Sequence, residues 1–172
     1  MIDSIYHVAM VEGPPRGGLP EGLASLAGFQ LSKCGWWMEQ RVEEELRPLG
    51  IRVRHFLVLA MLDSSGTLSQ QDMAGYLLLD PTLMVGLVDD LEERGLCERA
   101  RDPRDRRRYS VAITEDGRAL HRRARAAADR VGDEVFGPLD EEELRVLVRA
   151  VGRVMEPFWA EQAVRPRRKS AG

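Results

Sequence analysis

The chain has 172 residues, of which 44% are hydrophobic and 31% charged, and its formal net charge is -3. These values are ordinary for a soluble globular protein of one domain, and the acidic total disfavours binding to nucleic acid except through a local basic patch. No apolar run approaches the roughly 20 residues of a membrane span and the N-terminus lacks the basic start of a signal peptide, so we expect a cytoplasmic protein without membrane contact.

Clusters of residues that carry chemistry are missing from the sequence. Two cysteines without a signal peptide make a disulfide scaffold an unfavourable interpretation. His7, His55 and His121 are too scattered to suggest a metal site. No nucleophile is paired with a base and no glycine-rich loop is suited to cradle phosphate. We therefore expect no catalytic residue, no metal and no cofactor.

The first third of the chain is expected to be an arm followed by two helices. Residues 1–22 contain the breaker cluster G-P-P-R-G-G-L-P-E-G and are predicted to form an N-terminal arm. Residues 23–48 carry apolar side chains at helical spacing, which predicts a long helix up to Leu46. A second helix is expected from Ile51 to Leu62. Its expected inward residues are Val53, Phe56, Leu57, Ala60 and Met61.

Two capped helices follow. Ser69 is placed to cap the first, with Asp72 at the spacing of a capping box. Asp80 is placed to cap the second, Pro81 lies in its first turn, and Gly95 ends it. In the second helix Met84, Leu87, Val88 and Leu91 form one apolar stripe, and Thr82, Val85, Gly86, Asp89 and Asp90 are turned outward.

A basic hairpin comes next. Leu96 to Ala100 and Tyr109 to Ile113 are expected strands, and Thr67-Leu68 is a candidate for a short third strand. Asp102-Pro103 is typical of a turn, so the run R-D-P-R-D-R-R-R falls at the hairpin tip. A helix that enters a major groove beside an arginine-tipped hairpin that reaches the neighbouring minor groove is a DNA-binding arrangement. We predict a winged helix-turn-helix head over residues 49–114.

Two more helices complete a mainly α fold with a small β wing. One is expected from Thr114 to about Phe136, and the other from Glu141 to about Glu161. The terminal helices carry more apolar surface than the head needs to cover itself. We therefore predict that residues 23–48 and 115–161 are the dimerisation helices of a two-fold homodimer, followed by a basic tail at 162–172. Folding of these helices back onto a monomer core is the alternative.

Residues 79–96, L-D-P-T-L-M-V-G-L-V-D-D-L-E-E-R-G-L, are followed by D-P-R-D-R-R and I-T-E-D-G, and together they resemble the MarR family of bacterial winged-helix regulators. The resemblance is dense from Leu49 to Gly117 and continues by pattern alone over the flanking helices. It implies a homodimeric, sequence-specific transcriptional regulator, most often a ligand-responsive repressor. Such a dimer places its two recognition helices about one turn of double-stranded DNA apart, roughly 34 Å, on a palindromic operator.

The resemblance also assigns roles to the hairpin tip. It implies that Arg107 enters the minor groove and that Asp105 braces the loop through an ion pair. Arg104 and Arg106 are expected at phosphates, which position a protein without specifying the base sequence. The alternative for these residues is a solvated charged hairpin.

The two helices of the motif hold the other candidate DNA contacts. Many relatives have arginine where this chain has Gly86 and Asp90, so we expect thin direct base readout and recognition through the wing and DNA shape. Leu78 stands where the turn of the family usually has glycine. The candidate contacts are Thr82 at a base edge or phosphate, Pro81 and Val85 at thymine methyl groups, Gly86 on the same face, and Ser69, Gln70 and Gln71 at phosphates, with capping and solvation as the alternative for these last three.

Two regulatory hypotheses remain at this point. Trp36, Trp37 and His55 are candidates to line a pocket for a small aromatic or phenolic effector of the kind that family members bind, and packing at the dimer interface is the alternative. Cys34 suggests a thiol redox sensor, although its place on the apolar stripe favours inert packing, and Cys97 has a weaker claim. A winged-helix protein-interaction module that has lost DNA binding is a further alternative, favoured by the acidic second helix of the motif.

Overall fold

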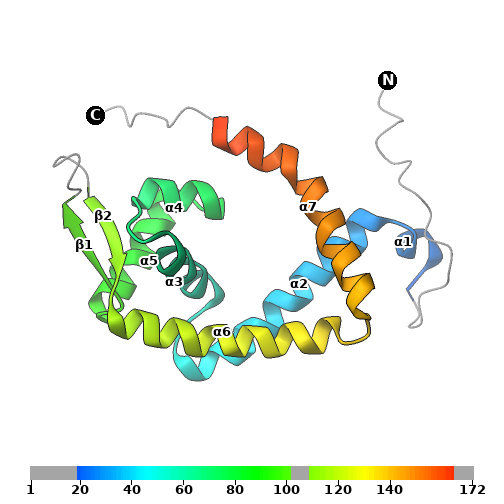
Figure 1. Cartoon of the computed structure of the whole chain (residues 1–172), viewed down its shortest axis with the longest axis horizontal. Coiled ribbons are helices and arrows are strands. Elements are labelled where there is room, and N and C mark those ends of the chain that lie inside the picture. The colour runs from blue at the N-terminus through cyan, green and yellow to red at the C-terminus, as the bar shows by residue number, and fades with distance from the viewer. Residues whose placement is uncertain (1–18, 102–108, 165–172) are drawn as a thin grey trace.

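The computed structural model describes residues 19–101 and 109–164, and it confirms a mainly helical fold with a small antiparallel wing (Figure 1). The predicted arm and basic tail lie largely outside the described residues. No helix in the described part combines the length and the apolar character needed to cross a membrane. In chain order the elements are α1 (Glu21–Ala24), α2 (Ala27–Leu46), the 3-10 turn η1 (Arg47–Leu49), α3 (Val53–Ser65), α4 (Gln70–Leu77), α5 (Pro81–Glu93), β1 (Cys97–Arg101), β2 (Tyr109–Ile113), α6 (Glu115–Phe136) and α7 (Glu141–Val164).

The head consists of α3, α4, α5 and the hairpin. The predicted stripe of α5 is buried, and it packs against α3, α4 and the inner face of the sheet. The hairpin pairs Cys97 with Ile113 and Arg101 with Tyr109. The candidate third strand is a single bridge, in which Leu68 pairs with Val111. The core of the head comprises Val58, Leu59, Leu62, Met73, Ala74, Met84, Leu87, Val88, Leu91, Leu96, Cys97, Val111 and Ile113.

Three helix bounds differ from the sequence-based expectation. The first helix is interrupted because Leu26 is extended (φ -88°, ψ 99°), which separates the short α1 from α2. The second helix starts at Val53, where the backbone N–H of Arg52 donates to the His55 ring, and runs on to Ser65. The last helix continues through Pro157 to Val164.

The expected inward face of α3 is also wrong in part. Val58, Leu59 and Leu62 are the buried residues of this helix, whereas Leu57 is 39% exposed. The helix is apolar on almost every side, so its periodicity does not specify which face the rest of the head covers.

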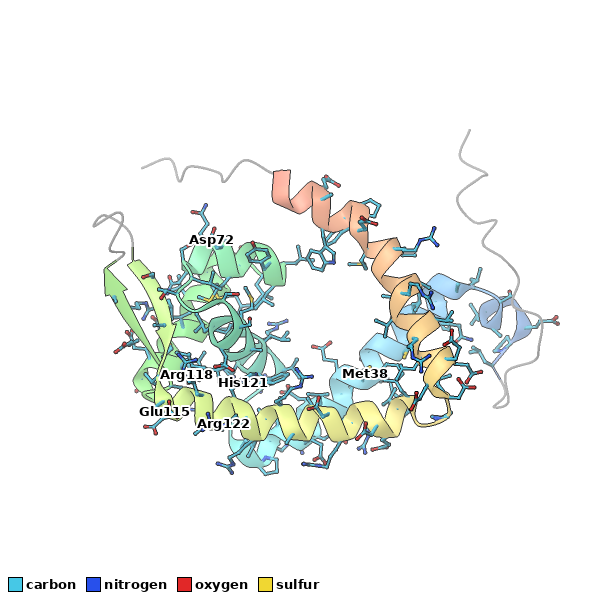
Figure 2. The ribbon with its side chains drawn as sticks, in the orientation of Figure 1. Met38, Asp72, Glu115, Arg118, His121 and Arg122 are labelled. Atoms are coloured by element: carbon cyan, nitrogen blue, oxygen red, sulfur yellow. The ribbon has the colours of Figure 1, made fainter. Side chains whose placement is uncertain are left out.

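A second core joins the head to α6. Val42, Leu46, Ile51, Ala124, Ala127 and Val131 bring α2, the start of α3 and the middle of α6 together. Polar contacts add to it, because Asp63 at the end of α3 accepts a hydrogen bond from Arg118 at 2.7 Å and lies 3.1 Å from Nδ1 of His121 (Figure 2). The α6 helix is continuous from the wing to the start of α7, and these contacts hold it against the head (Figure 1).

Candidate nucleic-acid interface

The helix-turn-helix is built by α4, a three-residue turn and α5. Ser69 caps α4 by accepting the N–H of Asp72 at 3.1 Å, and Asp80 caps α5 by accepting the N–H of Thr82 at 2.8 Å. In the turn, Leu78 has φ 53° and ψ 37°, which is the left-handed conformation that glycine adopts more easily. The turn is closed by a 2.9 Å hydrogen bond from the N–H of Leu79 to the carbonyl of Ala74.

The outward face of α5 carries few hydrogen-bonding side chains. Thr82, Val85, Gly86 and Asp89 are exposed, as the stripe pattern predicts, whereas Asp90 is half-buried. Pro81 is exposed as well. Leu83 lies at the flank of this face and is 38% exposed, and Val85 is 42% exposed. The N-terminal half of α5 therefore presents an apolar surface with the hydroxyl of Thr82 as its polar side-chain group.

Arg99 on β1 pairs with the acidic side chains at the C-terminal half of α5. Its guanidinium contacts the carboxylates of Asp89 and Glu92, and its backbone N–H donates to Glu92 at 2.8 Å. With its amide oxygen turned toward Arg99, Gln70 accepts from the same guanidinium at 2.7 and 3.0 Å. One arginine thus joins the first strand of the wing to both helices of the motif.

These contacts stabilise the ionised form of Glu92. The backbone hydrogen bond from Arg99 is the main cause that lowers the pKa of Glu92 below its ordinary value, and the guanidinium adds to it. The sequence pattern did not predict a role for Arg99 in this pairing. The spacing of Asp89 and Glu92, which puts both carboxylates on one side of α5, was the signal for such a pairing.

Asp90 is held from the other side of the helix. Nε2 of His55 lies 3.3 Å from its carboxylate, and Arg94 lies 3.4 Å from it. Burial lowers the pKa of His55 below its ordinary value, although Asp90 opposes the shift. Arg94 also donates to the carbonyl of Gly50 at 3.1 Å, so this cluster ties α5 to the turn before α3. His55 is therefore part of a structural junction.

The hairpin tip lies outside the described residues. This applies to Arg104, Asp105, Arg106 and Arg107, whose roles stay predictions. The strands on either side are described, and they remain paired up to Arg101 and Tyr109, the last residues before the tip. The tip is thereby attached to the same sheet that holds Arg99.

A cavity of about 620 Å³ opens at the junction of α2, α3, α6 and the start of α7. Its lining does not include the three residues predicted for an effector pocket. Trp36 and Trp37 are 59% and 45% exposed on α2, and His55 contacts Asp90 instead. The lining residues are Met38 (Figure 2), Phe56, Arg125, Ala128, Asp129, Gly132, Asp133, Phe136, Gly137 and Leu144.

Both cysteines lie in regular elements, Cys34 on α2 and Cys97 on β1. Cys97 is buried in the core of the head, and burial raises the pKa of its thiol to about 11, which keeps it protonated at neutral pH. Cys34 lies half-buried on α2. Within residues 19–101 and 109–164, no group of three or more histidine, cysteine or acidic side chains is arranged to hold a metal ion.

Comparison with known proteins agrees with the geometry. Residues 51–109 match the model of the MarR family. The HTH-type transcriptional repressor Rv2887 of Mycobacterium tuberculosis is 33% identical over 132 residues, which span 73% of this chain and 95% of that protein. A MarR family transcriptional regulator from Rhodococcus sp. RHA1 superposes with a TM-score of 0.69 at 34% identity, over 74% of this chain and 91% of its own. The structure of CouR from Rhodococcus jostii RHA1 bound to p-coumaroyl-CoA superposes with a TM-score of 0.70 at 35% identity, over 77% and 93%. The chain therefore belongs to the MarR family of winged helix-turn-helix transcriptional regulators.

Proposed function

We propose that this chain is a homodimeric transcriptional repressor that binds operator DNA through α4, α5 and the wing. The observation that carries the proposal is the exposed N-terminal half of α5, held beside a hairpin whose tip sequence is rich in arginine. The acids of α5 do not oppose DNA as the sequence suggests, because three of the four are paired with Arg99, Arg94 or His55. We assign the protein no catalytic activity and place it in the cytoplasm with the DNA it regulates.

The proposed dimer forms through residues 23–48 and 115–161, with residues 49–114 as the DNA-binding head. Large apolar side chains are exposed on these helices, which a stable monomer of this size would normally cover. The exposed residues are Leu23, Leu26, Leu31, Trp36 and Trp37 near the N-terminus, and Val146, Val148, Val151, Val154 and Trp159 on α7. A second copy related by a two-fold axis would bury both groups.

The proposed effector is a small aromatic molecule, and its site is the cavity described above. Phe56 belongs to the head and Phe136 to the far end of α6, so a molecule bound between them touches both parts of the protein. The relative CouR was solved with p-coumaroyl-CoA, which contains an aromatic ring. A ligand that fits one spacing of the heads better than another shifts the population toward that spacing and weakens DNA binding.

The first test is a mobility shift assay with the promoter upstream of the protein's own gene, at two salt concentrations, beside a scrambled duplex of equal length. Selective binding that weakens as salt rises supports the proposal, because phosphate contacts release counterions. Equal, weak binding to every genomic fragment would instead favour a protein-interaction module whose partner contacts the acidic helix.

The wing is tested by replacing Arg107 with alanine. We expect the operator affinity to fall by at least about fivefold, since loss of one base-contacting arginine costs roughly 1–3 kcal/mol. Dimerisation and melting temperature should stay at the wild-type values. Unchanged affinity in Arg107→Ala would remove the wing tip from the mechanism.

A further inference from the structure

The side chains on the outward face of α5 predict which bases this helix contacts. Thr82, Val85, Gly86 and Asp89 lie on one stripe, directly opposite the buried stripe of the helix. Side chains in the N-terminal part of a recognition helix contact base edges in the major groove. In this protein those positions hold an apolar group, a hydroxyl and a glycine.

Hydrogen-bonded readout of most bases is unavailable on this stripe. Guanine and adenine are read by arginine, lysine, asparagine or glutamine, none of which occurs in α5. Cytosine is read by a free carboxylate, but the carboxylate of Asp89 is held by Arg99. Apart from a hydrogen bond to the Thr82 hydroxyl, the remaining base feature in the major groove is the methyl group of thymine, which is contacted by apolar side chains.

The exposure of the apolar groups fits this feature. Val85 is 42% exposed at one flank of the stripe, and Leu83 is 38% exposed at the opposite flank, because residues two positions apart lie on different sides of a helix. A Cβ added at Gly86 would meet no protein atom within 4 Å, so packing inside the protein does not require glycine there. A missing side chain beside Val85 lets the helix backbone approach a partner closely.

We propose that Val85 reads a thymine methyl group in each operator half-site. The proposal rests on the proposed DNA binding and adds the base that α5 selects. The preferred half-site then contains a thymine whose methyl group, and not its hydrogen-bonding atoms, determines the affinity.

The experiment starts from duplexes selected by the full-length protein from a library with a randomised core. Each thymine of the selected half-site is replaced by uracil, which keeps base pairing and lacks only the methyl group. At the thymine beside Val85 we expect the affinity to fall about fourfold, equivalent to about 0.8 kcal/mol for one buried methyl. The Val85→Ala protein should bind the thymine and uracil duplexes equally.

The outcomes distinguish a failure of DNA binding from a failure of methyl readout. If no sequence is enriched, the proposed function fails, and this inference fails with it. If selected duplexes bind tightly but uracil substitution changes nothing, DNA binding stands and methyl readout is wrong. If the uracil penalty persists in Val85→Ala, another residue reads the methyl group and the assignment to Val85 is overturned, and Leu83→Ala then tests the other exposed apolar side chain. Both side chains are partly exposed, and alanine favours helix, so these variants keep the fold.

Discussion

Arg99 compensates the negative charge of a helix that faces DNA. It lies on β1, and its guanidinium contacts Asp89 and Glu92 of α5. Without it, two carboxylates would stand unpaired near the phosphates of a bound duplex. The net charge of -3 is thus a poor guide to DNA binding, because the positions of the paired charges matter more than their sum.

Replacement of Arg99 by methionine tests this role. Methionine keeps much of the apolar stem and removes the charge, so we expect operator affinity to fall about tenfold through repulsion by the two released carboxylates. The slope of log affinity against log salt should stay unchanged, because Arg99 binds carboxylates and not phosphate. The slope and the affinity are both measured by fluorescence anisotropy.

The matched control is Arg118→Met. Arg118 also pairs with a carboxylate, that of Asp63, but on the α6 side of the head. The Arg118→Met substitution removes the same charge from the protein and should change the operator affinity much less than Arg99→Met does. A salt slope that falls by about one unit in Arg99→Met would show instead that Arg99 touches a phosphate directly.

Leu78 holds a strained backbone conformation in the turn of the motif. A left-handed backbone costs a residue with a Cβ roughly 1–2 kcal/mol, and the Leu78 side chain is 56% exposed, so it returns little burial energy. We expect Leu78→Gly to raise the free energy of unfolding by about 1 kcal/mol, measured by urea denaturation. Leu57→Gly, in the regular part of α3 and 39% exposed, should lower it by about the same amount or more. A Leu78→Gly protein less stable than the wild type would contradict the strain.

At the scale of elements, the joint between the wing and α6 depends on close backbone contact. Thr114 caps α6 by accepting the N–H of Gly117 at 3.0 Å, and its hydroxyl donates to the carbonyl of Gly95 at 2.7 Å. These bonds pull the first turn of α6 against the chain at Leu96. A Cβ on Gly117 would lie 2.0 Å from the Leu96 carbonyl oxygen and 2.8 Å from Ile113.

Gly117→Ala should therefore destabilise the protein even though alanine favours helix. We expect the free energy of unfolding to fall by about 2–3 kcal/mol, because backbone atoms must move to relieve the overlap. Gly132→Ala in the same helix is the control, since its Cβ meets nothing within 4 Å, and it should be neutral or raise stability by up to about 1 kcal/mol. Equal effects of the two substitutions in thermal melts would argue against the close joint.

At the scale of the whole molecule, none of the described side chains of α7 is buried. The helix extends from the end of α6 that lies farthest from the wing (Figure 1). Val151 and Val154 are exposed although they continue the apolar stripe begun by Leu144 and Leu147. An exposed apolar stripe of this kind is typical of a helix that packs against a second subunit.

Val154→Arg is expected to produce monomers. Val154 is 70% exposed in the single chain, so the substitution leaves the fold of each subunit intact while it puts a charge in the proposed interface. The sedimentation coefficient should fall to that of a monomer, and operator affinity should fall more than tenfold because two linked heads bind more tightly than one. Glu156→Arg, on the opposite side of α7, should remain dimeric. A dimeric Val154→Arg protein would place the interface elsewhere.

The sequence by itself determined where α4 and α5 begin and where α5 ends. Ser69, Asp80 and Gly95 act where they were predicted, because a cap or a helix end depends on residues within about four positions along the chain. The buried stripe of α5 was likewise predictable, because one side of that helix is apolar and the other is not. The strong match to a known family follows from the same stretch of residues.

Only the tertiary structure decided the contacts between segments that are distant in sequence. It buried Val58, Leu59 and Leu62 on an α3 helix whose periodicity favoured no single face, and it placed His55 against Asp90 instead of in the cavity. It also brought Arg99 onto the acids of α5, which changes a helix that appeared unsuited to DNA into one whose charge is compensated. Capping and periodicity are local properties of the chain, whereas the choice of buried face and ion-pair partner depends on which elements pack together.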